Sequence, residues 1–308
     1  MSERIKAESA FNLIADILET VRFKGTVFFS SNLAAPWGVD FPAMDCPRFH
    51  IAVKGDFSIG TADQQVIRVK AGDIGMVANG QQHWLADKPG RTLESSELAA
   101  EACDLGRPMF QQGELSHRLI CGLVRFDSDL QHPMLSALPP LLCVHSDQDP
   151  AIANLIALID LELTASHGGS SQIIDRLAEI LFLRLLDCAG RSDESSDNFL
   201  SVLRDRRMHH ALALIHKQPE VDWSLSDLGE AVGMSRATLV RRFKEIVGVA
   251  PMAYLANWRM TKAHSLIKYS NYTIDQIAEL VGFASAKSFS RAFKRLFKQS
   301  PKALRKVS

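Results

Sequence analysis

Basic side chains recur in register in the last third of the chain. Arg241 and Lys244 are followed fifty residues later by Arg291 and Lys294. Guanidinium and ammonium groups bind phosphate, and Arg also forms paired hydrogen bonds with the major-groove edge of guanine. Residues 204–308 hold 19 Lys and Arg against 8 Asp and Glu, a net charge of +11, whereas the rest of the chain carries −11. The basic third is therefore predicted to bind a polyanion, and the acidic part to face away from it.

These basic residues belong to a unit that occurs twice. Residues 224–234 match residues 273–283, with Glu, Val and Gly at the same places. Ser224 is a good N-cap for a first helix, and Gly233 can adopt the left-handed conformation that ends it. Ser235 then begins a second helix with an apolar stripe at i, i+4 and i+7. Each copy is therefore predicted to be a helix, a tight turn and a second helix.

The outward face of each second helix carries the candidate DNA contacts. An α-helix fits the major groove, where exposed Arg and Lys reach bases or phosphates. The outward residues are Arg236, Ala237, Val240, Arg241 and Lys244 in the first unit, and Lys287, Ser288, Arg291, Lys294 and Arg295 in the second. A helix over residues 252–267 is expected to hold the two units at a fixed separation. The alternative is an ordinary helical bundle with a solvated basic face, which the duplication, the turn glycine and the charge disfavour.

The second unit carries the more specific pattern. It reads Ile277-Ala-x-x-Val-Gly-Phe283, Ser288-Phe-Ser-Arg-x-Phe-Lys294 and Phe297-Lys-x-Ser-Pro301. This pattern resembles the AraC/XylS family of transcription regulators. The resemblance implies two tandem helix-turn-helix units that enter the major groove about one helical turn apart. It also implies a double-stranded DNA operator and RNA polymerase as partners.

The resemblance assigns roles by position. The base-reading candidates are Arg236, Ala237, Val240 and Arg241 in the first unit, and Lys287, Ser288 and Arg291 in the second. Lys244, Lys294 and Arg295 are expected to contact phosphates, which position the protein without specifying sequence. Ala237 and Val240 are apolar where family members often carry larger or polar readers, so they would contact thymine methyl groups or nothing.

The first part of the chain has a different residue pattern. Short runs rich in β-branched and aromatic residues, separated by turn formers, predict a small sandwich or barrel. These runs are Thr26–Ser30, His50–Val53, Phe57–Ile59, Val66–Val69, Ile74–Val77 and Leu119–Phe126. From Pro150, apolar residues at helical spacing predict two helices that are apolar on more than one face. They would pack against the strand domain or against a second subunit, and we expect a homodimer.

The chain has 308 residues, which is long for a single domain. We therefore predict several segments along it. Residues 190–198 contain no apolar side chain that could join a core, so they are interpreted as part of a linker. The predicted segments are a sensor domain over 1–149, a dimerisation segment over 150–190, the linker over 191–203 and the DNA-binding domain over 204–308.

A second resemblance covers the first domain. Gly72-Asp-Ile-Gly-Met-Val-Ala-Asn-Gly-Gln-Gln-His83 is similar to the second motif of cupin barrels, with Ala78 in place of a proline. Flanking segments such as Arg48-Phe-His-Ile51 and Ile120-Cys-Gly122 look like the cupin-type sensor domain of one branch of the same regulators. The implied fold is a multidomain α+β chain: an N-terminal cupin-like β-barrel with flanking helices and an all-α tandem helix-turn-helix domain.

The cupin resemblance raises the question of a metal. Cupin enzymes bind a metal with an HxH pair, a glutamate and the second-motif histidine. Here His50 and His83 remain, Arg48 stands where another histidine would be, and no glutamate follows at the usual distance. The two histidines are a candidate metal site, with a cysteine as a further ligand, or else ordinary metal-free barrel residues. A divalent metal and a small-molecule effector are the candidate cofactors.

Other residues are candidates for ligand or redox sensing. Trp37, Phe49 and Trp84 are candidates to line an apolar pocket, or are plain core. Five scattered cysteines without a CxxC pair fit a reducing cytoplasm. Cys121 in a predicted strand and Cys103 in a predicted loop over 95–112 are the redox candidates, the alternative being inert buried thiols. No apolar run is long enough for a membrane helix, and the N-terminus does not resemble a signal peptide.

The sequence therefore predicts a cytoplasmic, sequence-specific DNA-binding transcription regulator that is not an enzyme. A small molecule, a metal or an oxidant would act on its N-terminal domain. One alternative is a metal-dependent cupin enzyme with an accessory basic domain. Another is a non-specific DNA binder, which would have equal affinity for any duplex.

Overall fold

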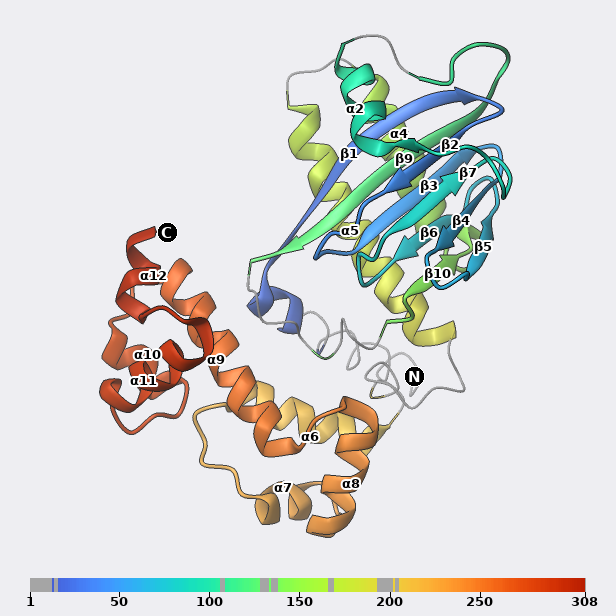
Figure 1. Cartoon of the computed structure of the whole chain (residues 1–308). Helices are drawn as coiled ribbons and strands as arrows, with labels where there is room; N and C mark the ends of the chain where they lie inside the picture. Colours follow the sequence, from blue (N-terminus) through green and yellow to red (C-terminus); the bar gives the residue numbers. More distant parts are fainter. Residues whose placement is uncertain are drawn as a thin grey trace. The chain divides into compact units, whose positions relative to one another are not determined.

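The computed structural model describes residues 13, 16–105, 109–127, 133, 138–165, 169–192, 202 and 205–307. The chain forms two compact units. The first contains residues 23–126 and 138–193, and the second contains residues 1–22, 127–137 and 194–308. Figure 1 shows strands together with helices in the first unit, whereas the described elements of the second unit are helices alone.

The first unit is built from two five-stranded sheets. Their strand orders are β1-β9-β3-β6-β10 and β5-β4-β7-β2-β8. The strands are β1 (Phe23–Ala34), β2 (Gly38–Phe41), β3 (Arg48–Lys54), β4 (Phe57–Thr61), β5 (Val66–Val69), β6 (Ile74–Val77), β7 (His83–Ala86), β8 (Glu94–Ser95), β9 (Leu115–Phe126) and β10 (Leu141–Val144). The expected β-rich cupin fold is confirmed, and the strands β2, β7, β8 and β10 are additions to the predicted set.

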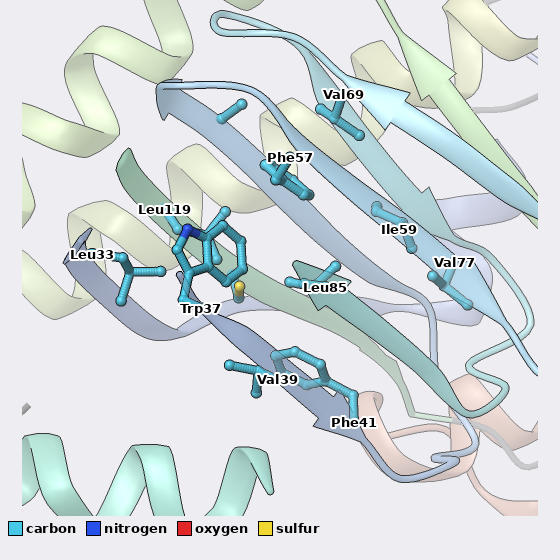
Figure 2. Close-up of a cluster of buried hydrophobic side chains, with 12 residues drawn as sticks. Leu33, Trp37, Val39, Phe41, Phe57, Ile59, Val69, Val77, Leu85 and Leu119 are labelled. Carbon is cyan, nitrogen blue, oxygen red and sulfur yellow. The ribbon is translucent and has the colours of Figure 1, made fainter. Parts of the chain in front are cut away.

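The core of this unit lies between the two sheets. It joins Ala52, Leu119 and Cys121 of one sheet to residues such as Phe41 and Leu85 of the other. Figure 2 shows these apolar side chains pointing toward one another between the strands. Because successive strand residues alternate in direction, Leu119 and Cys121 share the inner face. The inner face of β3 correspondingly carries His50 beside Ala52.

Three α-helices among the described residues belong to the same unit. Helix α4 (Pro150–Thr164) packs against β3, and α5 (Ser170–Ser192) packs along β1 and β9. Together they cover the outer face of that sheet (Figure 1). Helix α2 (Ser96–Asp104) occupies half of the segment 95–112 that was expected to be a loop, so that expectation was wrong for these residues. Its sequence is rich in Ala, Leu and Glu, which are strong helix formers.

The second unit is helical. Its helices are α6 (Arg206–Lys217), α7 (Leu225–Ala231), α8 (Arg236–Val247), α9 (Pro251–Tyr269), α10 (Ile274–Leu280), α11 (Ala286–Phe297) and α12 (Pro301–Val307). Ser224 and Thr273 each form a capping box at the start of α7 and α10. Gly233 and Gly282 follow these helices with φ of 66° and 75°, as the predicted tight turns require.

Helix α9 belongs to the cores of both repeats. It packs against α6 and α8 in the first half of the helical unit and against α10 and α12 in the second half. The ring of His216 in α6 stacks on Trp258 of α9 with ring centroids 3.8 Å apart. Phe289 and Phe293 of α11 are fully buried in the second core with Ile277. None of the helices among the described residues combines the length and the apolar character that a transmembrane span requires.

Candidate nucleic-acid interface and sensor site

The outer face of α8 carries the first set of predicted DNA contacts. Arg236, Ala237, Arg241 and Lys244 are exposed, and Val240 is half-buried. The helix begins at the N-cap Ser235, whose hydroxyl accepts a hydrogen bond from the Thr238 amide. Fully buried Leu239 and Phe243 fix the opposite face. The structure therefore brings this predicted set together on one exposed surface.

Helix α11 repeats this arrangement. Lys287, Ser288, Arg291, Lys294 and Arg295 are all exposed. Its opposite face is held by the buried rings of Phe289 and Phe293. Arg241 in α8 forms an ion pair with Glu245 at 2.8 Å. Arg291 has no such partner among the residues that the structure describes, so its guanidinium is available to another molecule.

The two histidines of the predicted sensor site lie side by side in the inner core. His50 Nε2 is 2.9 Å from His83 Nε2, and His50 Nδ1 is 3.0 Å from the Cys121 sulfur. His83 Nδ1 is 2.8 Å from the backbone oxygen of Gln81. Register explains the contact with the sulfur, because His50 on β3 pairs directly with Cys121 on β9. The structure thus brings together three of the residues singled out from the sequence.

The Gln81 oxygen sets the direction of a complete hydrogen-bond chain. A carbonyl only accepts, so His83 Nδ1 donates to it and His83 Nε2 is left as an acceptor. His50 Nε2 then donates to His83, and the Cys121 thiol donates to His50 Nδ1. All polar atoms of the three side chains are satisfied when both rings and the thiol are neutral.

The ionisation of these groups agrees with neutral side chains. Burial, the neighbouring His83 and Arg48 hold the pKa of His50 well below its ordinary value. Burial lowers the pKa of His83 to about 4, with the Gln81 hydrogen bond acting in the opposite direction. Burial raises the pKa of Cys121 far above that of a free thiol. A buried neutral thiol is a poor nucleophile, which argues against Cys121 as the direct target of an oxidant.

The guanidinium of Arg48 is buried next to this chain of hydrogen bonds. Arg48 is 3% exposed, and its Nε and Nη1 atoms have no hydrogen-bond partner among the described residues. Its guanidinium carbon lies 5.8 Å from the centroid of the Phe41 ring, which is itself stacked on His83. Burial lowers the pKa of Arg48. An unpaired buried charge is costly, so Arg48 is a candidate partner for an anion. The sequence signal was a charged residue two positions before His50, on the same strand face.

The other predicted sensor residues are not brought together. Phe49 follows Arg48 on β3 and points to the opposite face of the sheet, where its ring lies on Gly122. Trp84 follows His83 and lies over Gly60, and Trp37 packs against Phe57 and His117. The three aromatic residues do not form one pocket. The side chain of Cys103 lies outside the part of the chain that the structure describes.

The predicted two-histidine metal site is disfavoured by its surroundings. A metal between the two Nε2 atoms would have to displace the proton that they share. The ion would also add positive charge next to Arg48, which already lacks a counter-charge among the described residues. No carboxylate joins the histidines in a group of three metal-binding donors within the described ranges. The hydrogen-bonded pair fits these residues better than a metal centre.

Comparisons with known proteins found matches to both units. Residues 12–187 match the model of a cupin family, and residues 228–307 match that of a helix-turn-helix domain. The HTH-type transcriptional regulator AlkR of Acinetobacter baylyi is 28% identical over 96% of this chain and 99% of its own length. A putative AraC-like transcription regulator of Streptomyces lividans is 27% identical, over 95% and 97%. The HTH-type transcriptional regulator MtrA of Neisseria gonorrhoeae is 26% identical, over 96% and 98%.

Solved structures show lower overall similarity. An AraC-type DNA-binding domain-containing regulator from Chromobacterium violaceum is 29% identical over 33% of this chain and 91% of its own, with a TM-score of 0.31. The unsaturated fatty acid bound ToxT of Vibrio cholerae is 16% identical over 92% and 94%, with a TM-score of 0.37.

Proposed function

Because this chain belongs to the AraC family of transcription regulators, with a cupin N-terminal domain and a helix-turn-helix DNA-binding domain, we propose that α8 and α11 read a two-block operator. The observation that carries this proposal is the repeated helix-turn-helix unit with two exposed basic helix faces. Helix α9 has 19 residues. It is thus about 28 Å long at 1.5 Å per residue, a span similar to one turn of DNA, about 34 Å.

Each of the two helix faces carries residues for reading bases and residues for contacting phosphates. We propose that bases are read by Arg236, Ala237, Val240 and Arg241 in α8, and by Lys287, Ser288 and Arg291 in α11. Lys244, Lys294 and Arg295 contact phosphates. Arg241 must leave Glu245 to reach a base, whereas Arg291 has no described ion pair to break. Because of this difference, α11 is expected to contribute more sequence specificity than α8.

We propose that the signal reaches the inner core of the cupin unit at Arg48. A small molecule with a carboxylate or similar acidic group would pair with the buried guanidinium and accept hydrogen bonds from its Nε and Nη1 atoms. Such an effector supplies the counter-charge that the guanidinium lacks among the described residues. To change DNA binding, the effector must bind one arrangement of the protein more tightly than another.

We propose that α4 and α5 form a homodimer interface. Leu158 and Leu161 on α4 and Ile173 and Ile180 on α5 are large apolar side chains that remain exposed. They recur at helical spacing, i and i+3 on α4 and i and i+7 on α5, so each pair lies on one side of its helix. A second copy of the chain would cover this apolar surface.

The remaining assignments rest on the family. The relatives are named as transcription regulators, and we propose that this chain likewise acts without catalysis, in the cytoplasm, where it meets DNA and RNA polymerase. A cupin enzyme with an accessory basic domain is the other candidate. That candidate predicts turnover of a small molecule and no sequence preference in DNA.

The decisive experiment is selection of random duplex DNA on the full-length protein, followed by sequencing of the bound pool. We expect an enriched site with two short blocks about one helical turn apart. Enrichment only by residues 204–308 would show that the rest of the chain holds the protein in a non-binding state. Lack of enrichment by both would overturn the proposal of sequence-specific binding.

A further inference from the structure

A second group of reactive side chains lies at the β6–β10 edge of the cupin unit, apart from the histidine chain. Asp73, Cys143 and His145 each offer one donor atom, and these three atoms all lie within 4.8 Å of one another. Among the described residues, this is the only group of three such donors that lies so close together. The proposed DNA reading and effector binding use none of the three.

Strand geometry explains how these residues meet. Cys143 and His145 are two positions apart, so their side chains point to the same side of the strand. Strand β10 pairs antiparallel with β6, with Val144 opposite Ile74 and Cys143 opposite Gly75. Continuing this register places Asp73 opposite His145. The β6–β10 pairing therefore holds Cys143 and brings together Asp73 and His145, which directly flank the two strands.

The donors suit a divalent ion of intermediate softness. Thiolate sulfur, imidazole nitrogen and carboxylate oxygen are the ligands that Zn²⁺ takes in proteins. A thiolate and a carboxylate would balance the two positive charges of the ion. Asp73 is already oriented, because its Oδ1 accepts a hydrogen bond from the Ser146 amide at 3.2 Å and its Oδ2 lies 2.7 Å from His145 Nδ1. The side chain of His145 is 45% exposed, which leaves a path for the ion from solvent.

We propose that Asp73, Cys143 and His145 bind one Zn²⁺ ion, with water as the fourth ligand. Zinc bonds of about 2.0–2.3 Å place neighbouring donors about 3.3–3.6 Å apart. The His145 ring and the Asp73 carboxylate therefore separate slightly, and the Cys143 sulfur moves inward. As zinc binds, Cys143 loses its proton to solvent, and the proton that His145 Nδ1 donates to Asp73 Oδ2 leaves that nitrogen, so that the neutral ring carries its proton on Nε2. Because protons are released, zinc affinity rises with pH. Without the ion, burial and the neighbouring Asp73 carboxylate raise the pKa of the Cys143 thiol to about 11, and the charge of Lys70 acts in the opposite direction.

Zinc at this position would join three segments of the unit. Asp73 precedes β6, Cys143 is in β10, and His145 is the N-cap of the short helix η1 (Ser146–Gln148). Helix η1 leads directly into α4 through Asp149. The ion would therefore stabilise the cupin unit and fix the start of α4.

The test uses Co²⁺ as a spectroscopic probe in the chelator-treated, full-length protein. We expect one equivalent of Co²⁺ to produce a thiolate-to-cobalt charge-transfer band in the near ultraviolet, which one equivalent of Zn²⁺ abolishes. Cys143→Ser removes the band. Asp73→Asn and His145→Gln lower the Co²⁺ affinity at least tenfold. His117→Gln, at a half-buried histidine of the same unit, is the matched control and leaves the titration unchanged.

Two results would overturn the zinc site. One is the absence of the band in the wild-type protein. The other is a band that survives in Cys143→Ser but disappears in His50→Gln, which would place the thiolate at Cys121. Thermal melts without metal check that each variant folds, and a rise in the melting temperature on adding Zn²⁺ must likewise depend on Cys143. Operator selection by the metal-free protein tests DNA reading separately.

Discussion

At the scale of single residues, Arg291 and Lys294 on one helix are expected to make different DNA contacts, Arg291 with a base and Lys294 with a phosphate. Both are exposed on α11, three positions apart. We expect Arg291→Ala to cost about 1–3 kcal/mol of operator binding and to relax specificity at one base pair. Lys294→Ala should weaken binding to all sequences and reduce the salt dependence by about one ion. Gel-shift titrations on the selected operator and on its single-base variants measure both effects. Equal loss of affinity for every duplex in Arg291→Ala would remove its reading role.

Arg48 provides a second prediction about a single residue. Its guanidinium is buried without a described partner for two of its nitrogens. Replacing it with Met keeps the length and removes the charge, so we expect the cupin unit to become more stable by about 1 kcal/mol or more. The same variant should lose the response of DNA binding to an acidic effector. Denaturant unfolding and effector titration test the two parts, and a less stable Arg48→Met protein would show that the charge is already compensated.

The buried histidines predict loss of stability in acid. The pKa of His83 in the folded protein is about 4, below the ordinary value of 6.5. The unfolded chain therefore binds more protons between these values, and stability decreases as pH falls through this range. For His83 the loss is up to about 3 kcal/mol. Denaturant unfolding of the cupin unit at pH 7 and pH 5 captures about 2 kcal/mol of this loss. The pH dependence should be smaller in His83→Gln, and an unchanged slope would contradict the assignment.

At the scale of elements, the two helix-turn-helix units are alike in backbone but differ in how closely their turns are packed. Gly233 and Gly282 both have positive φ. A Cβ at Gly233 would meet nothing within 4 Å, whereas one at Gly282 would lie 2.7 Å from Arg259 Nη2 and 2.9 Å from the Glu220 backbone oxygen. We expect Gly233→Ala to destabilise by about 1 kcal/mol, from backbone strain alone. Gly282→Ala should cost clearly more, and thermal melts of the pair measure the difference. Equal costs would show that Arg259 moves freely.

At the scale of the whole molecule, self-association is predicted from the apolar surface of α4 and α5. Leu161 and Ile180 are 60% and 45% exposed. A glutamate at either position places a charge in the proposed interface, so Leu161→Glu and Ile180→Glu should dissociate the dimer. Leu98→Glu on α2, where the leucine is 52% exposed, is the matched control. Sedimentation equilibrium measures the mass of each variant. A wild-type monomer, or a dimer that persists in both variants, would contradict this interface.

The sequence by itself determined the elements whose signals are local. Ser224, Thr273 and the turn glycines specify helix starts and ends within a few residues, and the repeat at a spacing of about fifty residues specifies two such units. The exposed basic faces of α8 and α11 were predictable because helical periodicity separates them from Phe243 and Phe293. Strands β2, β7 and β10 contain at most one β-branched residue each and gave no clear strand signal, whereas β5 and β6, which have the same length, contain two or more.

The tertiary structure alone decided which distant residues meet. The histidine chain requires the β3–β9 register that sets His50 opposite Cys121. The approach of Asp73 to His145 requires the β6–β10 register, although the Cys143-x-His145 spacing was a local signal that could have been noticed. Burial of Arg48 and the separation of Phe49 from His50 likewise follow from which face of β3 points inward. A linear pattern specifies the local conformation of a segment, whereas strand pairing between segments far apart in sequence sets the neighbours and the charge state of each buried group.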